Sequence, residues 1–68
     1  MSAEGAVSGT SHIAIAVRDA DALAATLVSA LGAVRGEEEM LDGEALRVVF
    51  VRVGPVTFEL LEPRSPDP

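Results

Sequence analysis

Leu46–Glu62, with the sequence LRVVFVRVGPVTFELLE, is the stretch that decides the fold. Its first part, Leu46–Val53, is rich in β-branched residues and predicts a strand. Gly54 and Pro55 come next and are typical of a turn, so Val56–Glu62 is predicted to return as the second strand of a hairpin. The carboxyl-terminal part of the chain is therefore expected to be a β-hairpin.

A further strand is predicted at Ser11–Val17, SHIAIAV, because large and small side chains alternate there with a period of two. One face of this strand carries the larger apolar side chains Ile13, Ile15 and Val17, and the other carries His12, Ala14 and Ala16. A face of small residues around a single histidine leaves space over the sheet.

A helix is predicted at Ala20–Leu31, between this strand and the hairpin. Asp19 can cap its N-terminus with a side-chain oxygen, and Gly32 follows its last residue as the expected C-terminal cap. Apolar side chains recur along the helix at the spacing of one face, namely Leu23, Leu27, Ala30 and Leu31.

The segment between the helix and the hairpin predicts a weaker strand at Ala33–Met40 and a loop at Leu41–Glu44, where an Asp-Gly pair favours a turn. The strand contains three consecutive glutamates at positions 37–39. We interpret them as a solvated sheet edge that discourages pairing with another sheet.

The predicted order is thus β-α-β-β-β, an α+β fold made of a single βαβββ module over residues 11–63. Residues 1–10 are expected to form a flexible leader, and the proline-rich residues 64–68 an extended tail. The helix can shield only one sheet face, expected to carry Ile13, Ile15, Val17, Phe58 and Leu60. The other face needs a second layer, so the module implies a second copy of itself.

Composition excludes several classes of function. The chain has 68 residues and no cysteine, which excludes disulfides, thiol catalysis and cysteine-ligated metals. Eleven acids against five arginines give a net charge of −6, and only two residues are aromatic, so we expect no nucleic-acid partner. No apolar run approaches the roughly 20 residues that span a bilayer, and no export signal is recognisable, so we expect no membrane partner and a cytoplasmic location.

Three segments resemble one protein family. They are SHIAIAVRDADA at residues 11–22, ALGA at residues 30–33 and RVVFVRVGPVTFELLEP at residues 47–63. Together they are similar to the N-terminal module of vicinal-oxygen-chelate proteins, the superfamily of glyoxalases, bleomycin-resistance proteins and dioxygenases, and within it to methylmalonyl-CoA epimerases. The chain departs from the family in carrying one module where the family has two.

The resemblance implies that His12 and Glu59 are metal ligands, because each module of the family donates ligands from its first and last strands. Glu59 is also a lone acid within an apolar strand, which is costly unless a charged group meets it. Without the resemblance, His12 is interpreted as an inert histidine at a strand start and Glu59 as a solvent-facing acid. Glu59 and Glu44 are the candidate catalytic acids, Glu44 because family members often carry an acid in that loop.

Two ligands are too few for a divalent ion, whose identity stays open among Co, Mn, Ni, Zn and Fe. A homodimer that pairs His12 and Glu59 with their symmetry mates would supply four ligands. The implied function is that of an isomerase, epimerising a methylmalonyl-CoA-like acyl-CoA through a metal-stabilised enolate once dimerisation supplies the second module. The alternatives are a metal-free module that sequesters a small molecule, as bleomycin-resistance proteins do, and an inactive truncated half.

Two arginines, Arg47 and Arg52, lie on the same predicted strand. Either could bind a carboxylate of a substrate. We favour surface exposure, or pairing with the acidic residues 37–39, for both of them.

Overall fold

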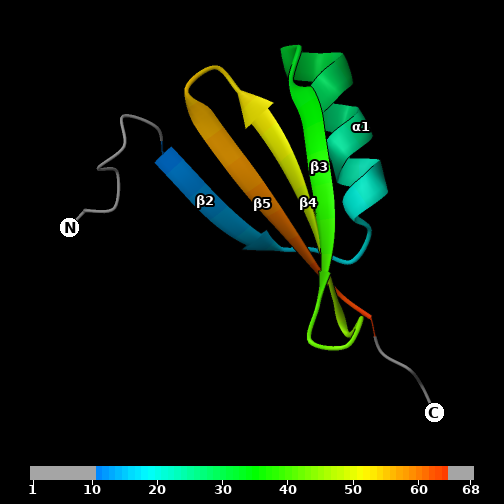
Figure 1. The fold of residues 1–68 in the computed structure, drawn as a ribbon. Helices are drawn as coiled ribbons and strands as arrows, with labels where there is room; N and C mark the ends of the chain where they lie inside the picture. The colour runs from blue at the N-terminus through cyan, green and yellow to red at the C-terminus, as the bar shows by residue number, and fades with distance from the viewer. Residues whose placement is uncertain (1–10, 65–68) are drawn as a thin grey trace.

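The computed structural model describes residues 11–64. Its elements are β2 (Ser11–Ala16), α1 (Ala20–Leu31), β3 (Val34–Leu41), β4 (Leu46–Val53) and β5 (Val56–Pro63) (Figure 1). The predicted β-α-β-β-β order and α+β class are confirmed, and each boundary lies within one residue of its prediction. The expectations for residues 1–10 and 65–68 lie outside the described residues.

The strands form one sheet in the order β2-β5-β4-β3. β4 pairs antiparallel with both β3 and β5, whereas β2 pairs parallel with β5. Parallel neighbours need a long crossover connection, and the chain between β2 and β5 contains α1 together with β3 and β4. This topology places the first and the last strand side by side, although the sequence separates them widely.

Local sequence signals determine both ends of α1. The Asp19 carboxylate accepts a hydrogen bond from the backbone N–H of Ala22 at 3.0 Å. Gly32 adopts the left-handed conformation with φ 69° and donates its N–H to the Val28 carbonyl at 3.1 Å, which ends the helix. No helix within residues 11–64 is long and apolar enough to cross a membrane.

The core lies between α1 and the sheet. Its fully buried helix residues are Ala20 and Ala24, one turn apart, and they meet Val49, Val51 and Leu60 of the central strands. Leu23 and Leu27 are half-buried and pack against this cluster. The predicted apolar stripe is wrong at its C-terminal end, because Ala30 and Leu31 are exposed. The two alanines, instead of large side chains, form the line of closest approach to the sheet.

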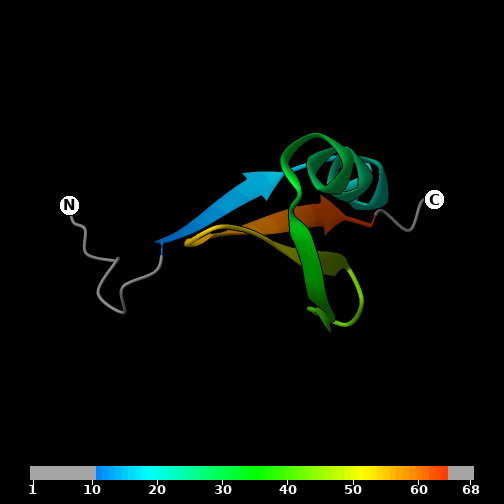
Figure 2. The same cartoon turned by 90° about the horizontal axis from the view of Figure 1, so that it is seen from above.

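α1 lies mainly over β4, with β3 and β5 beside it, on one side of the sheet only (Figure 2). β2 is the far edge strand, separated from β4 by β5. Ile13, which the sequence placed beneath the helix, is therefore 44% exposed, while Ile15 and Phe58 still pack against the core. The helix is too far from the edge strand to cover it completely.

The second sheet side is the open face, to which the alternation of each strand assigns every other residue. Strand pairing places three residues of β2 and four each of β5 and β4 on it, namely His12, Ala14, Ala16, Thr57, Glu59, Leu61, Pro63, Leu46, Val48, Phe50 and Arg52. Of these, Val48 is only 3% exposed. No layer from residues 11–64 covers this face (Figure 2). The expectation that one sheet face stays open within a single module is met in the described part of the chain.

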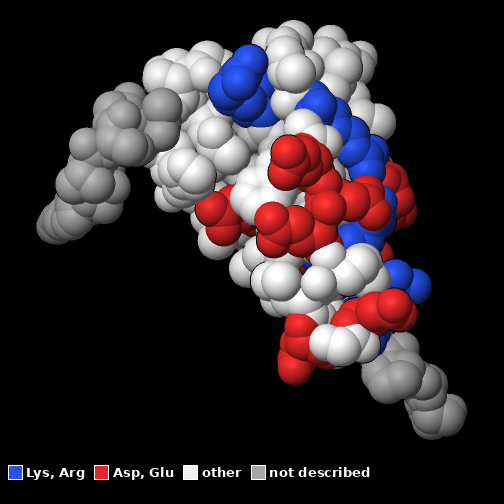
Figure 3. All heavy atoms as spheres, viewed as in Figure 1, with Lys and Arg blue, Asp and Glu red and all other residues white. Residues whose placement is uncertain are grey.

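β3 is the other edge strand and contains an irregularity. Arg35 pairs with Val51 and Glu38 pairs with Val49, so two residues of β3, Gly36 and Glu37, face the single residue Phe50 of β4. This is the count of a β-bulge, which bends an edge strand and interrupts its regular hydrogen bonding. All residues of β3 are exposed, and acidic side chains gather over this strand and the turn beyond it (Figure 3).

Candidate functional site

His12 and Glu59 meet on the open face. The imidazole Nδ1 of His12 lies 2.9 Å from Oε2 of Glu59. The cross-strand partner of His12 is Thr57, and Glu59 lies two residues further along β5, so the pair is a diagonal contact between adjacent parallel strands. The polar partner of the lone acid in this strand is therefore the histidine from the first strand.

The geometry leaves one histidine nitrogen available. An ionised carboxylate can only accept hydrogen bonds, so Nδ1 is the donor to Glu59 and a neutral imidazole then keeps a lone pair on Nε2. The His12 side chain is 53% exposed and that of Glu59 30%. The cross-strand neighbours of Glu59 are Ala14 and Phe50, which form a largely apolar floor around a partly accessible nitrogen–oxygen pair.

The atoms of this pair are of the kinds that bind a divalent transition metal, but two donors are fewer than most such sites use. Imidazole nitrogen and carboxylate oxygen are ordinary ligands of such ions, and most sites use three or four protein donors. Residues 11–64 contain no group of three His, Cys, Asp or Glu side chains arranged to hold an ion. One copy of the described chain therefore offers two neighbouring donors, fewer than such a site uses.

Glu44 lies away from the pair. It occupies the turn between β3 and β4 and has a left-handed backbone with φ 73°. The nearest end of β5, Pro63, is already four residues beyond Glu59, which is about 13 Å along a strand. The structure does not bring Glu44 to the pair within one chain.

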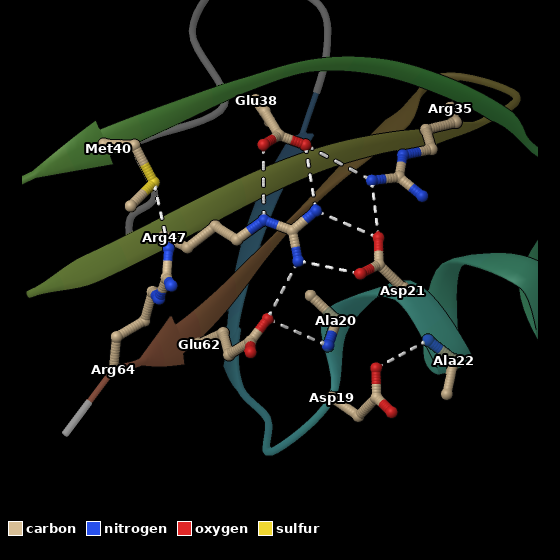
Figure 4. A network of polar contacts seen from close by, with 10 residues as sticks. All are labelled: Asp19, Ala20, Asp21, Ala22, Arg35, Glu38, Met40, Arg47, Glu62 and Arg64. Carbon is tan, nitrogen blue, oxygen red and sulfur yellow. Dashed lines mark hydrogen bonds and ion pairs between the residues drawn. The ribbon is translucent and has the colours of Figure 1, made fainter. Parts of the chain in front are cut away.

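A second polar cluster lies on the helix side of the sheet (Figure 4). Arg47 of β4 is its centre, and its side chain is only 16% exposed. The guanidinium donates to both carboxylate oxygens of Asp21 at 2.9 Å, to Glu38 at 2.9 Å and to Glu62 at 3.2 Å. Arg35 donates to Asp21 at 2.8 Å and to Glu38 at 3.3 Å. We call these five residues the arginine network.

The network confirms one expectation and extends it. Arg47 was expected either to be exposed or to pair with the acidic residues 37–39, and it pairs with one of them, Glu38. Sequence reasoning missed Asp21 and Glu62, although Asp21 is a first-turn acid and Glu62 lies directly opposite Arg47 in the β4–β5 pairing. Hydrogen bonds from Arg47 and then Arg35 hold the pKa of Asp21 well below its usual range, and those from Arg47 also lower the pKa of Glu38. These groups hold one another charged, which favours a structural role for the network.

A shallow hollow of about 400 Å³ lies at the carboxyl end of β2 and is lined by Ala16, Val17, Arg18 and Pro63. His12 is near the other end of that strand. The hollow therefore does not enclose the His12–Glu59 pair.

Comparison with known proteins gives two informative structural matches. A methylmalonyl-CoA epimerase from Mycobacterium tuberculosis superposes with a TM-score of 0.72 and 28% sequence identity, over 96% of this chain and 45% of that one. A hypothetical protein from Bacillus halodurans superposes with a TM-score of 0.71 and 30% identity, over 82% of this chain and 41% of that one. No family model matches the chain, and no curated protein does.

The chain thus has the fold of one vicinal-oxygen-chelate module, the class of fold that the sequence resemblance indicated. Of the two solved structures, the Mycobacterium protein is an epimerase of that superfamily. The chain spans less than half the length of either structure. It corresponds to one of the paired modules of the fold.

Proposed function

We propose that this chain forms half of a metal-dependent site of the vicinal-oxygen-chelate type, completed by a second copy, and that it isomerises a small carboxylated thioester of the methylmalonyl-CoA kind. The observation that carries the proposal is the 2.9 Å contact between His12 and Glu59 on the uncovered sheet face. The similarity to an epimerase at 28% identity supports the choice of reaction.

His12 and Glu59 would hold the ion, with His12 offering a neutral ring nitrogen and Glu59 a carboxylate oxygen. When bound, a divalent ion supplies Lewis-acid polarisation of carbonyl oxygens, which acidifies the neighbouring carbon. A carboxylate must then remove the proton from that carbon and return it on the other side. One Glu59 cannot serve as ligand and proton acceptor at once, so the second role falls to Glu59 of the second copy.

The two edge strands of the sheet differ in how readily each could pair with a second copy. The β3 edge carries three consecutive glutamates and a bulge, features that discourage further pairing. The β2 edge carries only uncharged residues from Ile13 to Ala16, and within residues 11–64 it is paired on one side alone. We therefore assign the interface to β2, paired antiparallel with its own copy.

This pairing keeps both open faces on the same side. A two-fold axis perpendicular to the sheet relates the copies, and a register centred on Ile13 places the two His12 Cα atoms roughly 8 Å apart, from a strand rise of about 3.4 Å and a strand spacing of about 4.8 Å. On the same spacings the two Glu59 Cα atoms, one strand further out, lie roughly 16 Å apart. The two imidazoles and one Glu59 carboxylate are therefore the donors that would hold the ion, and the other Glu59 is left to move the proton. A monomer cannot supply that donor set.

The proposal is tested by metal binding and mass measured on the same sample. We expect a dimer that takes up one divalent ion per two chains in a titration with Co²⁺ or Zn²⁺, and loses that uptake in His12→Ala and in Glu59→Gln. Glu44→Gln is the matched carboxylate control for binding. Exchange of the α-proton of methylmalonyl-CoA in D₂O, followed by NMR, tests the reaction itself.

A monomer that binds no ion would refute the proposal. Ligand binding by a metal-free dimer would instead support the sequestering alternative of the bleomycin-resistance type. Metal binding without proton exchange would retain the site and reject the proposed substrate.

A further inference from the structure

Arg47 and Arg52, the two arginines of β4, point to opposite sides of the sheet. They are five residues apart on a regular strand, an odd separation that places them on different faces. Arg47 is held by three carboxylates on the helix side. Arg52 lies on the open face, where the cross-strand register matches it to Thr57 of β5.

Thr57 is in turn matched to His12 of β2. Arg52, Thr57 and His12 therefore form one row across three adjacent strands, and the Cα atoms of Arg52 and His12 are roughly 10 Å apart, or two strand spacings. Only the small side chain of Thr57 lies between them in that row. The gap above Thr57, between the Arg52 side chain and the His12–Glu59 pair, is about as long as a small molecule.

Arg52 is exposed and has no carboxylate partner among residues 11–64, in contrast to Arg35 and Arg47. It is also the one arginine of the described strands that lies on the open face. The strand register places Arg35 and Arg47 on the helix side, and Arg18 and Arg64 lie outside the strands. In a chain of net charge −6 without lysine, an unpaired guanidinium next to a ligand-type nitrogen–oxygen pair is a specific feature of this face.

We propose that Arg52 binds a carboxylate of the small molecule that occupies the His12–Glu59 pair. This rests on the proposed function for the position and class of the ligand, and it adds the side chain that would bind the free carboxylate, a few carbons from the group held at the pair. The planar guanidinium donates two parallel hydrogen bonds to a carboxylate, a geometry that an ammonium group cannot reproduce. Phe50, two residues before Arg52 on the same face, offers apolar contact to the carbon skeleton between the two ends.

The test uses malonate as the probe and the arginine side-chain Nε–Hε signals as the readout, on metal-free full-length protein. Five arginines and no lysines make that region of the spectrum simple. We expect a saturable shift of the Arg52 signal, identified by its disappearance in Arg52→Gln, and no such shift with dimethyl malonate, which has no charge. Arg52→Gln should weaken malonate binding at least tenfold and Arg52→Lys by less.

Arg18→Gln is the matched control, because Arg18 is an exposed arginine outside the strands. It should leave the malonate titration unchanged. Equal shifts of the Arg18 or Arg64 signals, or no shift of Arg52, would overturn the proposal. So would an Arg52 signal that responds only to protein concentration, since that result assigns Arg52 to contact with another copy.

The metal titration separates this inference from the proposed function. Arg52→Gln should bind metal as the wild type does, because Arg52 is not a ligand. A protein that binds no metal but still shows the Arg52 shift would reject the metal site and keep the carboxylate-binding role. A protein that binds metal but shows no Arg52 shift would keep the metal site and reject the carboxylate-binding role of Arg52.

Discussion

Arg47 shows how a single side chain can join three other elements. It contacts Asp21 from α1, Glu38 from β3 and Glu62 from β5, and Glu62 also accepts a hydrogen bond from the backbone N–H of Ala20 at 3.3 Å. The first turn of α1 is thereby attached to the sheet. A lysine at this position could not donate to two carboxylates as a fork.

The arginine network predicts an acid-sensitive fold. The pKa values of Asp21 and Glu38 are lower in the folded chain than in the unfolded chain, so their contribution to stability is complete above the ordinary carboxyl range. It is lost as the pH falls below about 4, where the unfolded chain takes up protons first. We expect the melting temperature to fall between pH 5 and pH 3, measured by circular dichroism.

Arg47→Met provides the control for that prediction. It removes the hydrogen bonds that lower both pKa values, so we expect a lower melting temperature at pH 7 and a shallower dependence on pH below 5. Arg52→Met should change neither, because Arg52 has no carboxylate partner among the described residues. Identical acid profiles for the wild type and Arg47→Met would contradict the assignment.

At the scale of elements, α1 closes on the sheet through small residues. Ala20 and Ala24 are both fully buried, and they lie one turn apart on the line of contact with Val49, Val51 and Leu60. A large side chain at either position would push the helix away from the strands. The half-buried Leu23 and Leu27 then close the sides of the contact.

Ala24→Leu should therefore destabilise the fold even though leucine is a strong helix former. Inserting a larger side chain into a packed core costs about 1–3 kcal/mol. Ala25→Leu is the matched control, since Ala25 is exposed and the intrinsic helix propensity changes equally. Urea denaturation of both variants would measure the difference, and equal midpoints would show that α1 is packed through another face.

The bulge in β3 has a consequence for the arginine network. Arg35 and Glu38 are three residues apart, which on a regular strand would place them on opposite faces. The extra residue between them restores both to the helix side, where they contact Asp21 and each other. One irregularity in an edge strand thus brings an arginine and a glutamate to the same ion cluster.

At the scale of the whole molecule, a single sheet with a helix on one side leaves apolar and functional groups uncovered on the other. The solved structures that it resembles are more than twice as long as the region they share with it. A second copy paired at the uncharged β2 edge, as we propose, would extend the sheet and bring its own open face to the same side. The interface and the metal site are consequences of the same pairing.

A cysteine scan tests that pairing directly, because the natural chain has no cysteine. In the register centred on Ile13, the two copies of this residue face one another, and directly opposed strand residues have Cα atoms about 4.5–5.5 Å apart, within disulfide range. Ile13→Cys should form a crosslinked dimer under mild oxidation. Val28→Cys, at a position of similar exposure on the helix, is the control that should stay monomeric on a non-reducing gel.

Efficient crosslinking of Val28→Cys together with none of Ile13→Cys would place the interface elsewhere. Crosslinking at neither position, combined with a monomeric mass, would argue against the dimer itself.

The local sequence determined much of this protein by itself. Alternation, helix caps and turn residues predict every described element to within one residue, because each depends on contacts between near neighbours. His12 and Glu59 were singled out in advance by the family resemblance, whereas the residue pattern alone indicated an inert histidine and a solvent-facing acid. Their 2.9 Å contact agrees with that identification, while their role as metal ligands stays a prediction.

The tertiary structure alone decided how the elements meet. The position of α1 over β4 exposes Ile13 and Leu31, and the bulge in β3 sets the face of Glu38. These features depend on contacts between segments that are distant in the sequence, and no local pattern encodes them. The contact between Arg47 and Asp21, for example, joins residues 26 positions apart. The same long-range register assigned Arg47 to a structural network and left Arg52 on the open face. Their odd separation on one strand predicts opposite faces, but it does not tell which of the two faces the helix covers.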